Sequence, residues 1–237
     1  MISLIIPVRG EPPEIAERFR PFSIAGETEI LLADRGDGAE TTRAFERLGA
    51  RIVSGLGSRG LRLDRAARES RGDVLFFVHA DSRPPENAFP AIEETLGTGA
   101  VAGAFSLAYE NETAALAWIA WWANLRSRRL GLPFGDQGLF CRREAYMACG
   151  GFRDLPVCDD VDIVRRLKRV GRLRVRPEKM VTSPRRYTQA GALRQVLRNW
   201  RVLAGYFAGV SSDTLERWYR GPAQIRNPKS ETRNKSE

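Results

Sequence analysis

The segment Gly72-Asp73-Val74-Leu75-Phe76-Phe77-Val78-His79-Ala80-Asp81-Ser82 decides the fold class. An uninterrupted apolar run follows Gly72 and ends in a polar tip that carries Asp81, shortly before two prolines. Such a run, bounded by glycine and proline, is typical of a strand buried on both faces of a parallel sheet. Because ligands gather at the carboxyl ends of strands in open parallel sheets, we expect Asp81 at a ligand-binding edge.

Two interpretations of Asp81 fit this segment. A carboxylate at a buried edge is costly unless it is paired or binds a metal. Mg²⁺ and Mn²⁺ prefer such hard oxygen ligands, and Mg²⁺ commonly needs one or two carboxylates together with substrate phosphates. Asp81 could equally cap the turn before Pro84. The segment alone leaves both interpretations open.

The apolar segment is the fourth strand in a regular alternation of predicted strands and helices. We expect strands at 2–8, 29–34, 50–53 and 74–78, separated by helices that begin at 12, 41 and 61. This alternation predicts an α/β fold with a parallel sheet and covering helices. Asp34, which ends the second predicted strand, would then lie at the same sheet edge as Asp81.

The second half of the chain is less regular. Its pattern predicts helices at 88–96, 114–130, 143–149, 160–170 and 192–208, and strands at 99–109, 139–141 and 173–175. Asp162 is expected to be an exposed charge on the 160–170 helix. Residues 222–237 are polar without an apolar period, which predicts a disordered tail after a single domain at 1–221.

Composition limits the class of protein. The chain has 237 residues and three cysteines, whose spacing does not match a metal site, so we expect reduced thiols and a cytoplasmic location. An apolar stretch of about 18 residues, as a membrane-spanning helix needs, is absent from the sequence. The first eight residues have the pattern of a strand and not of a signal peptide.

The net charge of +9 is unevenly distributed, with −5 over residues 1–120 and +14 over residues 121–237. A basic half suggests an anionic partner such as a phosphorylated substrate, a lipid surface or a nucleic acid. A solvated arginine-rich face explains it as well. The stretch from Trp118, Trp121 and Trp122 to Arg129 could lie at the inner face of a membrane, although packing in the core is the commoner reason for such a pattern.

Five motifs occur in order along the chain: Ser3-Leu4-Ile5-Ile6-Pro7-Val8, then Asp34, then His79-Ala80-Asp81, then Gly135-Asp136-Gln137-Gly138 with Gly150-Gly151-Phe152, and finally Asp159-Asp160. Over about residues 1–220 they resemble the family 2 glycosyltransferases. The resemblance is narrower to small bacterial members with a His-Ala-Asp motif and a late Ser-Pro-Arg-Arg segment, here residues 183–186. Arg62 and Asp64 depart from the glutamine and asparagine usual in these proteins.

The resemblance implies the GT-A fold, a Rossmann-like and mostly parallel sheet flanked by helices. Residues 1–110 would form the nucleotide-sugar-binding half, and residues 111–221 a mixed acceptor half. It also implies metal-dependent transfer of a sugar from a nucleotide diphosphate to an acceptor hydroxyl. Transfer would invert the anomeric carbon in one displacement, without an enzyme nucleophile.

The resemblance also implies roles for individual residues. Asp81 would bind Mn²⁺ or Mg²⁺, and His79 would be a second ligand, an orienting group or a structural residue. The substrate-binding residues would be Pro7, Asp34, Arg59 and Asp136, with Arg185 and Arg186 in a mobile basic loop that closes over the diphosphate. Asp160 would be the general base, with Asp159 next to it, although both also fit helix capping.

The acceptor implied by the resemblance is a small molecule or a lipid-linked molecule, with an anionic membrane surface as a further candidate partner and no nucleic acid. The main alternative is a basic nucleic-acid- or membrane-surface-binding α/β protein without transferase activity. A nucleotidyltransferase would need a glycine- and lysine-rich phosphate loop near the start of the chain, and Arg9-Gly10-Glu11 is a poor substitute. A glycosidase with paired carboxylates would act without nucleotide or metal.

Overall fold

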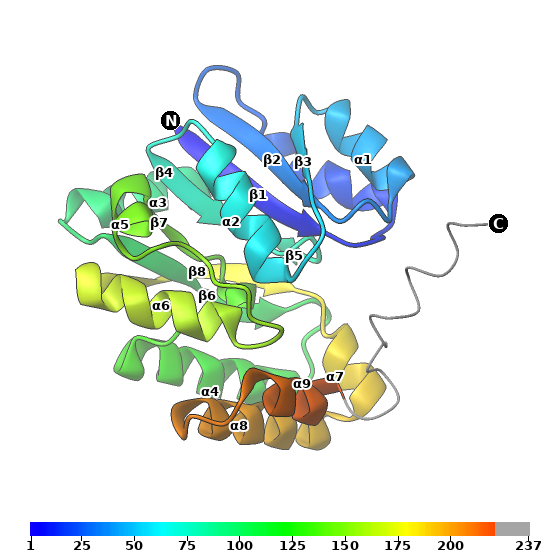
Figure 1. The fold of residues 1–237 in the computed structure, drawn as a ribbon, viewed down its shortest axis with the longest axis vertical. Helices are drawn as coiled ribbons and strands as arrows, with labels where there is room; N and C mark the ends of the chain where they lie inside the picture. Colours follow the sequence, from blue (N-terminus) through cyan, green and yellow to red (C-terminus); the bar gives the residue numbers. More distant parts are fainter. Residues whose placement is uncertain (221–237) are drawn as a thin grey trace.

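The computed structural model describes residues 1–220, apart from the side chains of residues 186, 189 and 190. The predicted tail at 222–237 lies outside the described residues. Eight strands form one sheet in the order β3-β2-β1-β4-β7-β6-β8-β5 (Figure 1). The strands are β1 Ile2–Val8, β2 Thr28–Asp34, β3 Arg51–Ser54, β4 Val74–Phe77, β5 Ser82–Arg83, β6 Ala102–Tyr109, β7 Phe140–Arg142 and β8 Leu173–Thr182.

Helices cover both faces of this sheet and extend beyond its β8 side (Figure 1). They are the 3₁₀ helices η1 Pro13–Phe22 and η2 Gly135–Gln137, and the α-helices α1 Ala39–Glu46, α2 Arg59–Glu69, α3 Ala88–Gly97, α4 Ala114–Leu130, α5 Arg143–Ala148, α6 Asp159–Val170, α7 Arg185–Ala190, α8 Ala192–Phe207 and α9 Ser212–Arg220. Within residues 1–220, none of these helices combines the length and apolar character needed to cross a membrane.

The sheet is parallel where the alternation predicted it. β3, β2, β1 and β4 pair in parallel, β7 is antiparallel to both β4 and β6, and β8 is parallel to β6. The predicted fold class is therefore confirmed.

The two buried faces follow from the alternation of side chains along a strand. In β1, Leu4 and Ile6 pack on one face with Phe45, whereas Ile5 packs on the other face with Leu63. Each such fully buried aliphatic or aromatic side chain contributes about 1.5–3 kcal/mol. All seven β1 residues are buried, which is why its sequence is almost continuously apolar.

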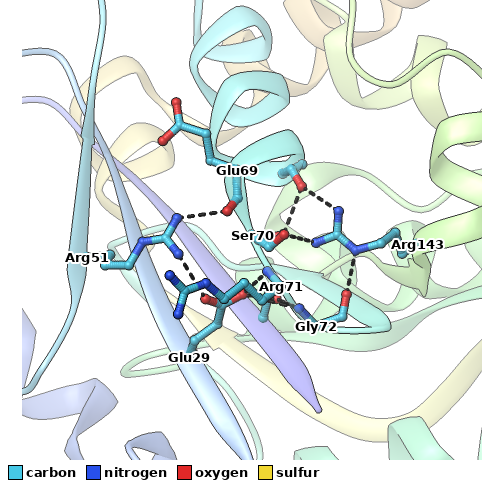
Figure 2. Close-up of polar contacts among 9 residues, drawn as sticks. Glu29, Arg51, Glu69, Ser70, Arg71, Gly72 and Arg143 are labelled. Carbon is cyan, nitrogen blue, oxygen red and sulfur yellow. Dashed lines mark hydrogen bonds and ion pairs between the residues drawn. The ribbon is translucent and has the colours of Figure 1, made fainter.

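Helix α2 runs from the carboxyl edge of the parallel strands to their amino edge, and polar contacts hold both of its ends. Ser58 caps its start, with the hydroxyl accepting a hydrogen bond from the Leu61 N–H at 3.2 Å. At its other end, Arg51 donates to the Glu69 carbonyl at 2.8 Å. Arg143 approaches the same turn from the opposite side (Figure 2).

Arg143 donates to the carbonyl oxygens of Gly72 at 2.7 Å and Ala67 at 3.2 Å, and to Ser70. Cations next to the last carbonyls of a helix satisfy their hydrogen bonds and complement the helix dipole. This cluster, drawn in Figure 2, fixes α2 at the amino edge of the sheet. Because the helix is rigid, it also fixes the position of Arg59 at the carboxyl edge.

Several predictions about elements were wrong. The basic segment at 185–186, expected to be a loop, begins α7, and α9 was not predicted. β8 extends seven residues beyond the predicted 173–175 strand, because its largely polar, half-exposed residues hide the pattern of a buried strand.

Two expectations about burial were also wrong. Trp118, Trp121 and Trp122 are 57%, 56% and 44% exposed and do not pack in the core. Asp162 is buried, where it accepts hydrogen bonds from Arg166 at 2.9 Å and from the Tyr206 hydroxyl at 3.2 Å. The hydrogen bond between Tyr206 and Asp162 joins α8 to α6. It depends on how these two helices pack, which the local sequence pattern does not predict.

Candidate functional site

Residues from four separate segments meet at the carboxyl edge of β1 and β4. Pro7, Arg59, His79, Asp159 and Asp160 line one small cavity of about 20 Å³, together with Phe134, Gly135 and six apolar residues. The chain supplies them from the end of β1, the start of α2, the residues after β4 and the start of α6. Five of the residues singled out in the sequence therefore share one site.

Arg59 connects Asp159 to His79. Its Nε donates to Asp159 Oδ2 at 2.9 Å, a second nitrogen donates to Oδ1, and its Nη1 lies 3.0 Å from His79 Nε2. Because a guanidinium can only donate, this contact makes Nε2 of His79 the acceptor. Burial alone would lower the pKa of Arg59, but the Asp159 carboxylate raises that pKa overall, so Arg59 stays charged.

Asp159 and Asp160 are neighbours with different surroundings. Asp159 is 3% exposed and its oxygens face Arg59. Asp160 is half-buried, and its Oδ2 accepts the Gly135 N–H at 2.9 Å while Oδ1 accepts the Val161 N–H at 2.8 Å. These bonds orient the Asp160 carboxylate towards the cavity that it lines.

Stabilisation of the helix start accounts for part of this pair's surroundings, because both carboxylates lie in the first turn of α6, where the helix dipole favours negative charge. The cap residue of α6 is Cys158, which has a left-handed backbone with φ of 60°, and the two aspartates are the first residues of the helix itself. Burial and the adjacent charges of Asp160 and Asp159 raise the pKa of the Cys158 thiol to about 12. Cys158 therefore stays protonated and is no candidate for a nucleophile at neutral pH.

Asp34 ends β2 between Val8 of β1 and Ser54 of β3. It is 5% exposed, and among the described residues its Oδ1 has no hydrogen-bond partner. Buried carboxylate oxygens are usually paired, so this unpaired oxygen at the carboxyl edge of the sheet is a candidate contact for a ligand.

Arg62, one of the departures from the family pattern, completes the same edge. It is buried and donates to the carbonyl oxygens of Val8 at 2.7 Å and Ala33 at 3.0 Å. Burial lowers the pKa of Arg62, and the nearby Arg35 and Arg9 lower it further. Arg62 thus secures the ends of β1 and β2 beside Asp34.

Asp81 is exposed at the end of the β4 segment. Its backbone carbonyl accepts hydrogen bonds from the Ser183 N–H and from Arg18 Nη1, both at 3.3 Å. The first bond brings the start of α7, with the exposed Arg185, next to Asp81. The side chain of Arg186 lies outside the described residues.

A metal ion at this edge would depend on few protein ligands. Within residues 1–220, no three histidine, cysteine, aspartate or glutamate side chains gather as a metal site. Mg²⁺ often binds through one or two carboxylates plus substrate phosphates, and the exposed carboxylate of Asp81 suits that kind of site. His79 Nε2 faces Arg59 in this structure, which favours an orienting role over ligation.

Asp136 belongs to a second, larger cavity of about 290 Å³ between α4 and α8. Phe134 lines both cavities, and Arg126 of α4 stacks over its ring with Cζ 3.4 Å from the centroid. Asp136 therefore lines a different cavity from Arg59, and Phe134 lines both.

Sequence reasoning missed three residues of the site. Gly135 was part of a quoted motif, but its role is the N–H that it donates to Asp160. Phe134 separates the two cavities, and Arg18 reaches Asp81 from η1. A Gly-Asp pair in a loop hints at a tight backbone approach, whereas nothing local in the sequence identifies Phe134 or Arg18.

The sequence matches no protein-family model and no curated protein sequence. The structure, however, is similar to solved glycosyltransferases. One is the mannosyltransferase PcManGT from Pyrobaculum calidifontis in complex with GDP-Man and Mn²⁺, with a TM-score of 0.61 and 17% identity over 85% of this chain. This chain spans about 60% of the length of that protein.

Two further structures are similar. Residues 1–349 of Staphylococcus aureus TarS in complex with UDP-GlcNAc give a TM-score of 0.61 at 13% identity, over 77% of this chain and 58% of that one. Glucosyl-3-phosphoglycerate synthase from Mycobacterium tuberculosis, with Mn²⁺, UDP-glucose and phosphoglyceric acid, gives 0.55 at 20% identity, over 84% of this chain and 77% of that one. At these identities the similarity is one of fold, and the chain has the GT-A glycosyltransferase fold.

Proposed function

We propose that this protein transfers a sugar from a nucleotide diphosphate to an acceptor hydroxyl with the help of a divalent metal ion. The observation that carries the proposal is the gathering of Asp34, Asp81, Arg59 and Asp160 at the carboxyl edge of one parallel sheet. The solved proteins with this fold were crystallised with GDP-mannose, UDP-GlcNAc or UDP-glucose, two of them also with Mn²⁺.

The donor would bind across the ends of β1, β2 and β4. The unpaired Oδ1 of Asp34 would accept a hydrogen bond from the nucleoside, and Pro7 and Arg59 would form the wall beside it. Arg185, at the start of α7, and Arg186 would bind diphosphate oxygens, because guanidinium groups match phosphate geometry. The hydrogen bond from the Ser183 N–H to the Asp81 carbonyl, two residues before α7 begins, supports this assignment.

A bound Mn²⁺ or Mg²⁺ supplies Lewis-acid stabilisation of the leaving diphosphate, and Asp81 is the residue that would hold it. His79 would keep Arg59 in place beside the developing negative charge. His79 and Asp81 lie two and four residues after the end of β4, and Asp81 directly precedes β5, so these two strands fix both ends of the short segment that carries them.

Asp160 would act as the general base. The acceptor oxygen forms its bond to the anomeric carbon as the bond from that carbon to the diphosphate breaks, and the acceptor proton passes to Asp160. The two N–H donors that hold Asp160 leave lone pairs on the same carboxylate for that proton. A single displacement of this kind inverts the anomeric carbon.

Calorimetry with UDP, GDP, dTDP and CDP, with and without Mn²⁺, tests this proposal. We expect one nucleotide to bind, at least tenfold more tightly with Mn²⁺, and we expect Asp81→Ala to remove most of that gain. Asp73→Ala is the matched control, because Asp73 is an exposed aspartate at the opposite end of the same strand. Absence of binding for all four nucleotides, with and without Mn²⁺, would overturn the proposal.

A further inference from the structure

The cavity between α4 and α8 has an apolar body and a polar inner end. Along α4, the residues Trp118, Trp122 and Arg126 are spaced by four, so they follow one face of the helix over about 12 Å. Trp200 and Leu203 of α8 form the opposite wall. Figure 1 shows α4 and α8 side by side on the β8 side of the sheet.

The inner end lies next to the reaction site. Arg126 stacks on Phe134, which also lines the cavity that holds Asp160, and Asp136 follows two residues later in the chain. Arg126 and Asp136 carry opposite charges, so this end has no net charge. It therefore suits a neutral hydroxylated group, whereas a phosphate would gain from Arg126 and be repelled by Asp136.

The outer end is open and aromatic. Trp118, Trp122 and Trp200 remain about half-exposed while they line the cavity. The volume of about 290 Å³ lies just below the usual range for small-molecule sites, which begins at about 300 Å³, and such sites are mostly apolar with a few placed polar groups. Exposed aromatic walls of this kind gain free energy when an alkyl or prenyl chain covers them.

We propose that this cavity binds the acceptor, and that the acceptor is an uncharged amphipathic alcohol or glycoside. Its alkyl or prenyl chain lies along Trp118, Trp122 and Trp200, and its hydroxyl end passes Phe134 towards Asp160. This inference rests on the proposed function, because it names the substrate class of the same site. The proposal also explains why Trp118 and Trp122 are exposed, although the sequence pattern favoured packing in the core.

Calorimetric titration with octyl β-glucoside below its micelle concentration tests the assignment. We expect Ala123→Phe, which fills the cavity, and Trp200→Ala, which removes an exposed wall, each to weaken binding at least fivefold. Phe207→Ala is the matched control, since Phe207 is a similarly exposed aromatic residue of α8 that does not line the cavity. The affinity of this control variant for octyl β-glucoside should stay within twofold of that of the wild type. Octyl phosphate should bind the wild type more weakly than octyl β-glucoside does.

The outcomes separate the two proposals. Nucleotide binding without any binding of octyl β-glucoside would overturn the acceptor assignment and leave the proposed function intact. Binding of octyl β-glucoside without binding of any nucleotide would overturn the proposed function and with it the acceptor role. Stronger binding of octyl phosphate would overturn the uncharged class. Binding to phosphatidylglycerol vesicles, measured by sedimentation, is a further test. If the wild type binds them and Trp121→Ala abolishes this binding as fully as Trp200→Ala, the exposed face of α4 and α8 would be assigned to a membrane surface instead.

Discussion

Asp159 and Asp160 are adjacent and identical residues, but their different surroundings suit them to different roles. Asp159 is almost fully buried and both of its carboxylate oxygens accept hydrogen bonds from Arg59, whereas the Arg59 guanidinium lies 3.9 Å from the nearest oxygen of Asp160. Asp160 is held by two backbone N–H groups and still borders the cavity. We therefore regard Asp159 as a positioning residue for Arg59 and Asp160 as the proposed catalytic base.

Asp160→Asn should lower the rate of sugar transfer by about 10²–10⁴-fold, because the amide cannot accept the acceptor's proton. The affinity for the nucleotide should stay within about twofold, since the amide oxygen can still accept the Gly135 N–H. Initial-rate measurements and nucleotide titrations on the same preparations check this. Asp154→Asn, an exposed aspartate of the preceding loop, is the control and should leave both values unchanged. Normal transfer by Asp160→Asn would exclude it as the base.

At the scale of elements, the loop that ends in η2 brings the two halves of the site together. Gly135 of η2 donates to Asp160 at the start of α6 and passes close to His79 after β4. A Cβ atom at Gly135 would lie 2.7 Å from His79 Nε2 and 3.3 Å from Asp160 Oδ2. Glycine is needed here for close approach, because any side chain would displace two site residues.

Gly135→Ala should reduce transfer at least tenfold, since a misplacement of about 1 Å in a catalytic group can cost 10²-fold. The fold should persist, because the clash involves side chains at the surface of a cavity and not the core. Rates measured beside a urea unfolding curve check both statements. Gly97→Ala in α3 is the control, because nothing lies within 4 Å of its Cβ position. An unchanged rate in Gly135→Ala would show that the close approach is not needed for catalysis.

Across the whole molecule, the sheet interleaves strands from both ends of the chain. β7 lies between β4 and β6, and β8 lies between β6 and β5. The predicted halves at 1–110 and 111–221 are therefore joined in one sheet, which favours cooperative unfolding over independent unfolding of the halves. All five tryptophans lie in the second half, at residues 118, 121, 122, 200 and 218, so their fluorescence reports on that half alone.

Urea unfolding followed by tryptophan fluorescence and by far-ultraviolet circular dichroism should therefore give coincident curves. Leu75→Ala, a fully buried residue of β4 in the first half, should cost about 2–5 kcal/mol and move both curves equally. Leu56→Ala, a leucine that is 78% exposed, should move neither curve by more than about 0.5 kcal/mol. Separate midpoints for the two signals would show that the halves unfold independently.

The sequence by itself determined the parallel part of the sheet and the place of Asp34 and Asp81 on it. Apolar runs that end in an aspartate are local patterns, and parallel strands joined by helices bring their carboxyl ends to one edge. Helix α4 was predicted with its observed bounds, because Thr113 caps its start and Gly131 ends it. These features depend on residues that are neighbours along the chain, so the sequence pattern alone predicts them.

Only the tertiary structure decided which partners the polar residues have. Arg59 and Asp159 are 100 residues apart, and the contact between them depends on the packing of α2 beside α6. The burial of Asp162 and the exposure of Trp121 reversed what helical periodicity favoured. Periodicity identifies the face of a helix, but which face meets another element is decided by the packing of segments distant in sequence, and that packing also creates the cavity beside Phe134.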